Sequence, residues 1–297
     1  MAAFQPFFSP KQVAKALDAS ESSVKRWCDQ GAIETVRTVG GHRKISLDAL
    51  QRFLEASNRT LANPQLIGLR VAPQSTTNYS VTGDREDQIA FRKLLADGDE
   101  LACGRILRDR IQRSGAPRSR VADFFITDAM HGIGDAWDKS ELDAYQERRG
   151  CEICLRLIHE LRSSLPLPSP TAPIAVGGTL SGDPYQIPTA LVELSLREMG
   201  WNATNLGCEL PVESFLRAAN DYQPTMIWIS VSTISDEKAF AESENRLVDG
   251  LPTETAVVLG GRALASLSTE NLQYSALCNA LGELTDFAHL LSASKSA

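Results

Sequence analysis

The sequence contains no apolar run long enough to cross a membrane, and its first residues lack the charged and apolar regions of a secretory signal peptide. Its six cysteines are scattered rather than arranged as a disulfide framework, which is typical of proteins in a reducing compartment. These absences predict a cytoplasmic protein without a membrane partner. Hydrophobic residues make up 43% of the 297 residues, so we expect two or three domains with real cores.

The chain also lacks an excess of positive charge, since its formal net charge at pH 7 is −7. A basic balance is the usual sign of nucleic-acid binding, and the chain as a whole does not have one. The charge is unevenly divided, however. Residues 1–57 hold eight lysines and arginines against six acidic residues, whereas the remaining residues hold 22 against 31. Only the N-terminal region is therefore a candidate for binding DNA.

Residues 9–53 carry the signals of two short helices separated by a tight turn. Ser9 can cap the first helix, a proline follows it, and Gln12 stands where a capping box needs it. Ser20 can cap the second helix. Gly31 is placed to end that helix as a left-handed C-terminal residue. Together these signals predict a helix-turn-helix.

A basic hairpin is expected behind the second helix. The two glycines within residues 39–42 permit a tight reversal, and cations lie on both arms. Ser46 can then cap a third helix packed through leucines and a phenylalanine. The alternative is a small helical domain with an ordinary solvated basic face. The order of helix, turn, helix and basic hairpin favours DNA binding, with the second helix in the major groove and the hairpin cations on phosphates.

The segment Val39-Gly-Gly-His-Arg-Lys44 resembles the wing of the MerR-like and excisionase-like winged helix. The resemblance covers less than a fifth of the chain. It implies that Lys25 and Arg26 face the groove and that the cations of the hairpin contact the DNA backbone. The candidate DNA-binding residues are therefore Ser22, Ser23, Lys25, Arg26, Arg37, His42, Arg43 and Lys44.

Residues 58–83 lack periodicity and are rich in Asn, Pro, Ser and Thr, so we expect a linker with a short strand or contact near 66–71. A segment docked on the folded domains is the alternative. Residues 84–165 carry four amphipathic stretches, and Ser119 can cap the third of them. Four such helices with short connections predict an antiparallel four-helix bundle.

From residue 171 to residue 297, short apolar runs alternate with helical patterns. This alternation predicts a doubly wound parallel sheet of flavodoxin-like type, with ligands at the carboxyl ends of its strands. Strands are expected at 173–177, 203–206, 226–230, 256–260 and 275–278, and helices at 189–199, 212–221, 237–248 and 281–291. The expected fold class is thus multidomain α and α/β: a winged helix-turn-helix, a four-helix bundle and a doubly wound domain.

A bundle followed by such a domain resembles the cobalamin-binding module of methionine synthases and of the light-sensing MerR-type regulators. That family carries Asp-x-His-x-x-Gly, then Ser-x-Leu after 41 residues, and Gly-Gly roughly 27 residues later. This chain keeps the spacing with Asp183-Pro-Tyr185-Gln-Ile-Pro188, Ser230-Val-Ser232 and Gly260-Gly261. Tyr185 stands where the family has the histidine that binds cobalt. A phenol with a pKa near 10 is a poor ligand for that metal.

The light-sensing regulators also carry, in the bundle, a tryptophan followed after nine residues by Glu-His. Here Trp137 is followed after nine residues by Glu147-Arg148, and an arginine has no lone pair to give a metal. Both cobalt-binding histidines of the family are therefore replaced here, so we expect no metal ligand and make no firm prediction of a cofactor. Base-on cobalamin, another tetrapyrrole, a different small ligand and a cleft filled by its own side chains all stay open. The candidate residues of this ligand cleft are Trp137, Glu147, Arg148, Asp183, Tyr185, Ser230, Ser232, Gly260 and Gly261.

The favoured interpretation is a cytoplasmic transcription regulator without enzymatic activity, a homodimer or tetramer that binds double-stranded operator DNA. Another ligand or an antagonist protein would act on the cobalamin-type surface, or the oligomer would bind DNA constitutively. One alternative is a cobalamin-carrying methyl-transfer subunit, and another is a chromophore sensor with Cys151 or Cys208 as covalent anchor. The Cys151-Glu-Ile-Cys154 spacing lacks a second ligand pair, which favours a structural role for it.

Overall fold

The computed structural model describes residues 7–37, 43–59, 61–63, 69–70 and 84–293. The chain forms two compact units. The first contains the described N-terminal residues up to Arg70 together with residues 171–185 and 202–293, and the second contains residues 84–170 and 186–201. Within the described residues, no helix is both long and apolar enough to span a bilayer.

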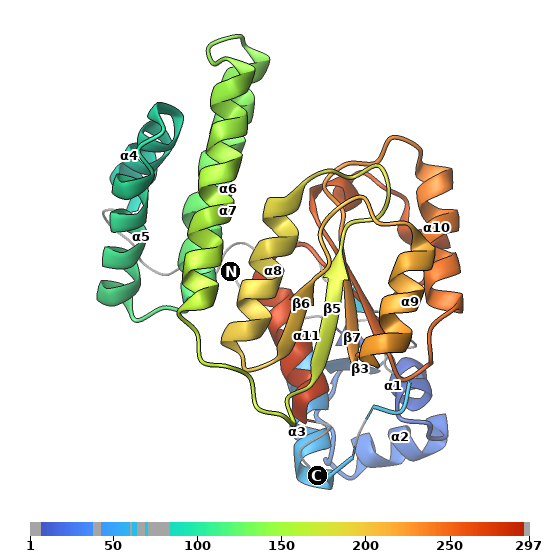
Figure 1. Cartoon of the computed structure of the whole chain (residues 1–297). Coiled ribbons are helices and arrows are strands. Elements are labelled where there is room, and N and C mark those ends of the chain that lie inside the picture. Colours follow the sequence, from blue (N-terminus) through green and yellow to red (C-terminus); the bar gives the residue numbers. More distant parts are fainter. Residues whose placement is uncertain (1–6, 38–42, 60, 64–68, 71–83, 294–297) are drawn as a thin grey trace. The chain divides into compact units, whose positions relative to one another are not determined.

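The N-terminal part of the first unit is a helix-turn-helix with a small antiparallel sheet, drawn in blue in Figure 1. Its elements in chain order are β1 (Phe7–Phe8), α1 (Pro10–Ala16), α2 (Glu21–Asp29), β2 (Val36–Arg37), β3 (Arg43–Ser46) and α3 (Leu47–Ser57). The strands lie in the order β1-β3-β2. The three helices and the hairpin strands are as the sequence predicts, whereas β1 is an additional strand. The expected turn at residues 39–42 lies outside the described residues.

The predicted helix caps are present. Ser9 and Gln12 form a reciprocal capping box, with backbone-to-side-chain distances of 2.9 and 3.2 Å. Ser20 and Ser46 each accept the backbone N–H three residues further on, at 3.1 Å in both cases. Gly31 follows α2 with a φ of +75°, which a glycine adopts without strain. The core of this domain is formed by Phe8, Val13, Val24, Ile33, Ile45, Leu50, Phe53 and Leu54, which are at most 5% exposed.

The second unit is a helical bundle. Its helices are α4 (Asp84–Asp97), α5 (Glu100–Ser114), α6 (Arg118–Asp138), α7 (Ala144–Ser163) and α8 (Gln186–Glu198). The first four are the bundle that the sequence predicts. The fifth, α8, follows the strand Ile174–Gly178 of the large sheet, yet Ala190, Leu191 and Leu194 belong to the core of the bundle.

One predicted cap in the bundle is wrong. Ser119 does not cap α6, because the N-cap residue is Pro117, which has no side-chain donor or acceptor. The carboxylate of Glu198 does this work instead. It accepts the backbone N–H groups of Arg118 and Ser119 at 2.7 and 3.0 Å, and the Ser119 hydroxyl at 2.7 Å. A negative charge at a helix N-terminus is also favoured by the helix dipole.

The C-terminal part of the first unit is a parallel sheet. Its strands are β4 (Leu69–Arg70), β5 (Ile174–Gly178), β6 (Asn202–Asn205), β7 (Met226–Ser230), β8 (Ala256–Gly260) and β9 (Ala276–Cys278). Their order is β4-β9-β8-β7-β5-β6, and every pairing is parallel. The order of the last five strands is that of a flavodoxin-like sheet. The predicted fold class is therefore confirmed, and β4 falls within the segment where a short strand is expected.

Three helices of the first unit belong to this sheet: α9 (Val212–Tyr222), α10 (Glu237–Asp249) and α11 (Leu281–Ala293). Helices α9 and α10 cover one face through a core that includes Phe215, Leu247 and the inner side chains of β7. The strand order reverses between β5 and β7, whose carboxyl ends lead into the loops 179–185 and 231–236. Open α/β sheets bind ligands at this switch point.

Candidate functional site

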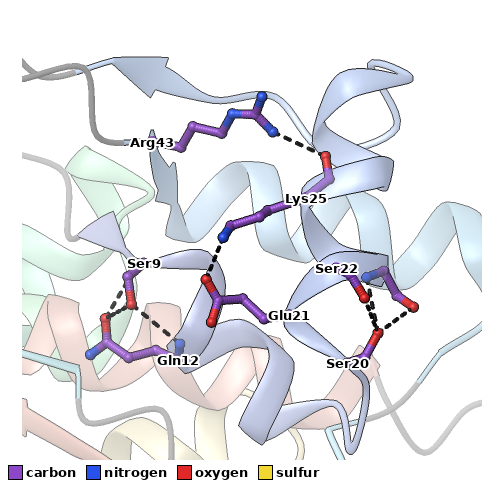
Figure 2. A network of polar contacts seen from close by, with 8 residues as sticks. Ser9, Gln12, Ser20, Glu21, Ser22, Lys25 and Arg43 are labelled. Carbon is purple, nitrogen blue, oxygen red and sulfur yellow. Dashed lines mark hydrogen bonds and ion pairs between the residues drawn. The ribbon is translucent and has the colours of Figure 1, made fainter.

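Four of the predicted DNA-binding residues lie on α2, and Figure 2 labels two of them, Ser22 and Lys25. The hydroxyls of Ser22 and Ser23 lie 2.8 Å from the hydroxyl of the capping serine. Lys25 forms an ion pair with Glu21 at 2.7 Å, and its hydrogen bond and charge lower the pKa of that carboxyl. Arg26 is exposed and has no ion-pair partner within the described part of the chain. This helix therefore presents two hydroxyls, one paired cation and one unpaired cation.

The other predicted DNA contacts lie on the hairpin, except His42, which is outside the described residues. Arg37 pairs with Arg43 across the two strands, and Val36 pairs with Lys44. Residues that pair directly share a face of the sheet, so Arg37 projects on the same face as Arg43, and Lys44 projects on the opposite face. Neither Arg37 nor Lys44 forms an ion pair among the described residues.

Arg43 differs from the other cations because its guanidinium is bonded inside the domain (Figure 2). Its Nη1 donates to the backbone oxygen of Lys25 at 3.1 Å, the bond drawn in Figure 2. Its Nη2 donates to Oδ1 of Asp29 at 2.5 Å. The Arg43 side chain is 22% exposed, against 54% for Lys25. Its contact with a phosphate stays a prediction, while these internal bonds are observed.

A second set of contacts holds α2 against α3. The ring of Trp27, on α2, lies 5.1 Å from that of Phe53, on α3. The guanidinium of Arg59, which follows α3 in the chain, lies 4.7 Å from the centroid of the Trp27 ring. Aromatic and cation–π contacts of this kind each contribute on the order of 1 kcal/mol. Through Trp27, the helix that carries the candidate base-reading residues is therefore held against α3 and the residues that follow it.

The second candidate site lies at the carboxyl edge of the parallel sheet. Asp183, in the loop after β5, is buried and uses both carboxylate oxygens for backbone N–H groups. Oδ1 accepts from Tyr185 at 3.1 Å, and Oδ2 accepts from Ser232 at 2.6 Å and Thr233 at 3.4 Å. Burial raises the pKa of Asp183, and these N–H bonds oppose the rise. The carboxylate thus ties the loop after β5 to the loop after β7.

Arg262 is a residue of this edge that the sequence reasoning misses. It begins the short 3₁₀ helix Arg262–Ala265, directly after β8 and a glycine. Its Nε donates to the backbone oxygen of Ser232 at 3.0 Å, and its guanidinium lies 5.1 Å from the centroid of the Tyr185 ring. The Tyr185 ring is 43% exposed. The position after Gly260-Gly261 is the signal that could have indicated Arg262.

The two glycines at the end of β8 have packing roles of their own. A Cβ on Gly261, whose φ is +133°, would lie 2.2 Å from the backbone oxygen of Val231. A Cβ on Gly260 would lie 2.9 Å from the backbone oxygen of Cys278. Ser230, the register partner of Gly260, is buried at the end of β7. These residues therefore pack closely together at the carboxyl edge of the sheet.

A small cavity lies at the switch point, bordered by the loops after β5 and β7 and by α10. Its volume is about 190 Å³. Sites for drug-sized ligands usually measure roughly 300–1,000 Å³, so this cavity suits only a small molecule. Its polar lining residues are Ser181, Asp183, Ser230, Thr233, Ser235, Asp236 and Ser243.

The remaining cleft candidates lie on the bundle, in the other unit. Trp137, near the end of α6, is 50% exposed. On α7, Oε1 of Glu147 accepts the Cys151 thiol at 3.3 Å, and its Oε2 lies 3.6 Å from Nε of Arg148. The structure thus brings Asp183, Tyr185 and Ser232 together in one unit, and Glu147 with Arg148 in the other.

The cysteine pair of α7 has a structural environment. Cys154 is fully buried in the core of the bundle, and burial raises its pKa well above the usual range. Burial, with the hydrogen bond to Glu147, raises the pKa of Cys151 to about 12. The described residues contain no cluster of three or more His, Cys, Asp or Glu side chains that could hold a metal. Thiols that stay protonated are poor nucleophiles and metal ligands.

Comparison with known proteins gives matches for both parts of the chain. Residues 7–58 match the helix-turn-helix domain family. A dimethylamine corrinoid protein of Methanosarcina barkeri is 29% identical over 91 residues, which cover 30% of this chain and 42% of that protein. The dimethylamine corrinoid protein 2 of Methanosarcina mazei is 22% identical over 137 residues, which cover 44% and 63%. The chain spans less than two thirds of the length of these relatives.

A structural match covers the C-terminal part. The monomethylamine corrinoid protein of Methanosarcina barkeri superposes with a TM-score of 0.55 at 17% identity, over 70% of this chain and 99% of that one. At this level of identity the likeness concerns the fold. An N-terminal helix-turn-helix domain is therefore joined here to a module with the fold of corrinoid proteins.

Proposed function

We propose that this protein is a MerR-type transcription regulator that acts in the cytoplasm as a homodimer or tetramer and has no enzymatic activity. The observation that carries the proposal is the helix-turn-helix of residues 7–58, with its caps, core and antiparallel hairpin in place. Helix α2 enters the major groove of operator DNA. The contacts of the proposal are Ser22, Ser23, Lys25 and Arg26 from α2, and Arg37, His42, Arg43 and Lys44 from the hairpin.

The chain as a whole is acidic, but the positive charges of the N-terminal domain support DNA binding. Once internal ion pairs are counted, Arg26, Arg37 and Lys44 are the cations of α2 and the hairpin without a partner among the described residues. Lys25 is exposed and can exchange its surface pair with Glu21 for a phosphate. Each phosphate contact contributes about 0.9 to the slope of log affinity against log salt. Three phosphate contacts, from Lys25, Arg37 and Lys44, predict a slope of about −3 for each head, while Arg26 contacts a base edge.

The C-terminal module serves oligomerisation and signal input, and we infer that it has lost histidine-ligated cobalamin binding. Its residues do not fit a cobalt held by the polypeptide. Tyr185 is paired with Arg262, and both oxygens of Asp183 accept backbone N–H groups. His289, on α11, is the single histidine of residues 171–297. Another small ligand or an antagonist protein supplies the signal, or the oligomer binds DNA constitutively.

The DNA-binding part of the proposal is tested with the full chain and a random-sequence duplex pool. Fluorescence anisotropy between about 50 and 200 mM salt should give binding with a slope of roughly −3 per head. Repeated selection from the pool should enrich a palindromic sequence, because a symmetric oligomer binds two half-sites. No binding at the lowest salt would reject the proposal.

A second candidate function is a sensor that holds base-on cobalamin or another tetrapyrrole. The similarity to corrinoid proteins favours it, together with the half-exposed Trp137. A methyl-transfer subunit is a third reading of the same similarity. Purified protein incubated with adenosylcobalamin and desalted should remain without corrinoid absorption if the favoured proposal holds. Retained absorption with light-dependent operator affinity would support the sensor, and a mass increase would indicate a covalent chromophore on Cys151 or Cys208.

A further inference from the structure

We propose that Arg43 is a positioning residue, which locks the hairpin onto the recognition helix instead of contacting a phosphate. The inference rests on the proposed function and changes the role of one of its expected contacts. Among the cations that the structure describes on α2 and the hairpin strands, Arg43 is the one whose two terminal nitrogens both donate within the domain.

The two acceptors of Arg43 lie one helical turn apart. Lys25 and Asp29 are four residues apart, so their positions fall on the same face of α2. The planar guanidinium can donate to both acceptors at once because its N–H groups form a rigid fork. One bond goes to the helix backbone and the other to a carboxylate, which fixes both the position and the angle of β3 against α2.

Contacts of Ile45 with the core hold the same strand, β3, further along the chain. Ile45 lies two residues after Arg43, on the same face of β3, and its side chain is fully buried. Phe8 pairs with Ile45 across β1 and β3. The strand is therefore held to the core by Ile45 and to α2 by Arg43. Arg37, the register partner of Arg43, takes its place relative to α2 from this attachment.

The clamp also removes a charge that would oppose DNA. The carboxylate of Asp29 is 61% exposed and lies on the recognition helix. The Arg43 guanidinium lies 2.5 Å from this carboxylate, so the positive charge of Arg43 balances Asp29 instead of a DNA phosphate. A lysine has a compact ammonium and cannot span both acceptors, although it could hold a phosphate equally well. Replacing Arg43 by lysine therefore separates the two roles.

The test uses the full chain, the random-sequence duplex pool and a duplex enriched from that pool by the wild type. Arg43→Lys and Arg43→Ala should both weaken binding to the enriched duplex roughly ten-fold, with an unchanged salt slope. Asp29→Ala should lower the preference for the enriched duplex over the pool to a similar degree, and Arg43→Ala/Asp29→Ala should be no worse than either single variant. The matched controls are Arg37→Ala, which should flatten the slope by about 0.9, and Arg37→Lys, which should keep it.

An Arg43→Lys variant with wild-type affinity, together with a slope about 0.9 flatter in Arg43→Ala, would overturn the proposal in favour of a phosphate contact. If the wild type binds no duplex at all, the proposed function fails. The contact of Arg43 with α2 is then tested by thermal unfolding of the same variants. Arg43→Ala and Asp29→Ala should then each lower the melting temperature, and Arg43→Ala/Asp29→Ala should lower it by less than the sum of the two single losses. Additive losses would overturn the clamp.

Discussion

Replacing Glu244 by glutamine should change how the stability of the sheet domain depends on pH. Glu244 lies on α10 and is fully buried. Its Oε2 accepts the backbone N–H of Gln273 at 3.1 Å, and its Oε1 has no hydrogen-bond partner among the described residues. Burial raises the pKa of Glu244 from 4.5 to about 8, and the nearby Asp249 adds to the rise.

The direction of the effect follows from proton linkage. The folded protein keeps the Glu244 proton up to about pH 8, while the unfolded chain loses it above about pH 4.5. The wild type is therefore stabilised by this group fully below pH 4.5, and that stability is lost as the pH rises to about 8. Each pKa unit corresponds to about 1.4 kcal/mol, so the free energy of unfolding should fall by about 5 kcal/mol over this window through Glu244.

Calorimetry of the full chain at several pH values between 5 and 8 measures this effect. The Glu244→Gln variant does not titrate, so its free energy of unfolding relative to the wild type should rise steadily with pH. Any constant cost of the buried amide cancels from that slope. Glu242→Gln, at an exposed position of the same helix, serves as the control and should show no such trend. A difference between Glu244→Gln and wild type that stays constant from pH 5 to pH 8 would refute the reasoning.

Two further substitutions test the contacts that shape the two units. Glu198→Ala removes the carboxylate that caps α6 and should destabilise the bundle by about 1–2 kcal/mol in calorimetry. The control Glu160→Ala breaks an exposed ion pair with Arg108 and should cost less than about 0.5 kcal/mol. Equal losses of stability in the two variants would contradict the capping role. Gly261→Ala should cost about 1–3 kcal/mol more than Gly207→Ala, because both glycines have positive φ but only the first meets a backbone oxygen; similar melting temperatures for the two would contradict it.

The parts of the fold that local sequence signals determine are the parts that could be predicted. Caps such as Ser9 and Ser20 bond to N–H groups three residues away, so a short window of sequence contains both partners. The strands β7 and β8 are continuous buried runs of mostly apolar residues, as is typical of the inner strands of a parallel sheet, and such runs can be recognised in the sequence one by one. The alternation of strands and helices then predicts a parallel sheet wrapped by helices.

Contacts between distant residues could not be predicted in the same way. The carboxylate of Glu198 caps a helix that begins about 80 residues earlier in the chain. Asp183 accepts an N–H that lies 49 residues further on, and Arg43 bonds to acceptors 14 and 18 residues before it. Periodicity and capping rules describe neighbours in sequence and carry no information on such pairs. This is why the candidate cations were found from the sequence, while the internal use of Arg43 was not.

The central claim is that the N-terminal domain binds duplex DNA through the unpaired cations of α2 and the hairpin. The most direct measurement is the salt-dependent affinity of the full chain for its enriched duplex, compared with Arg26→Ala and with Arg37→Ala. Arg26→Ala should cost about 1–3 kcal/mol and shift the sequence preference, whereas Arg37→Ala should weaken all duplexes alike and flatten the slope by about 0.9. Wild-type affinity in both variants would contradict the account.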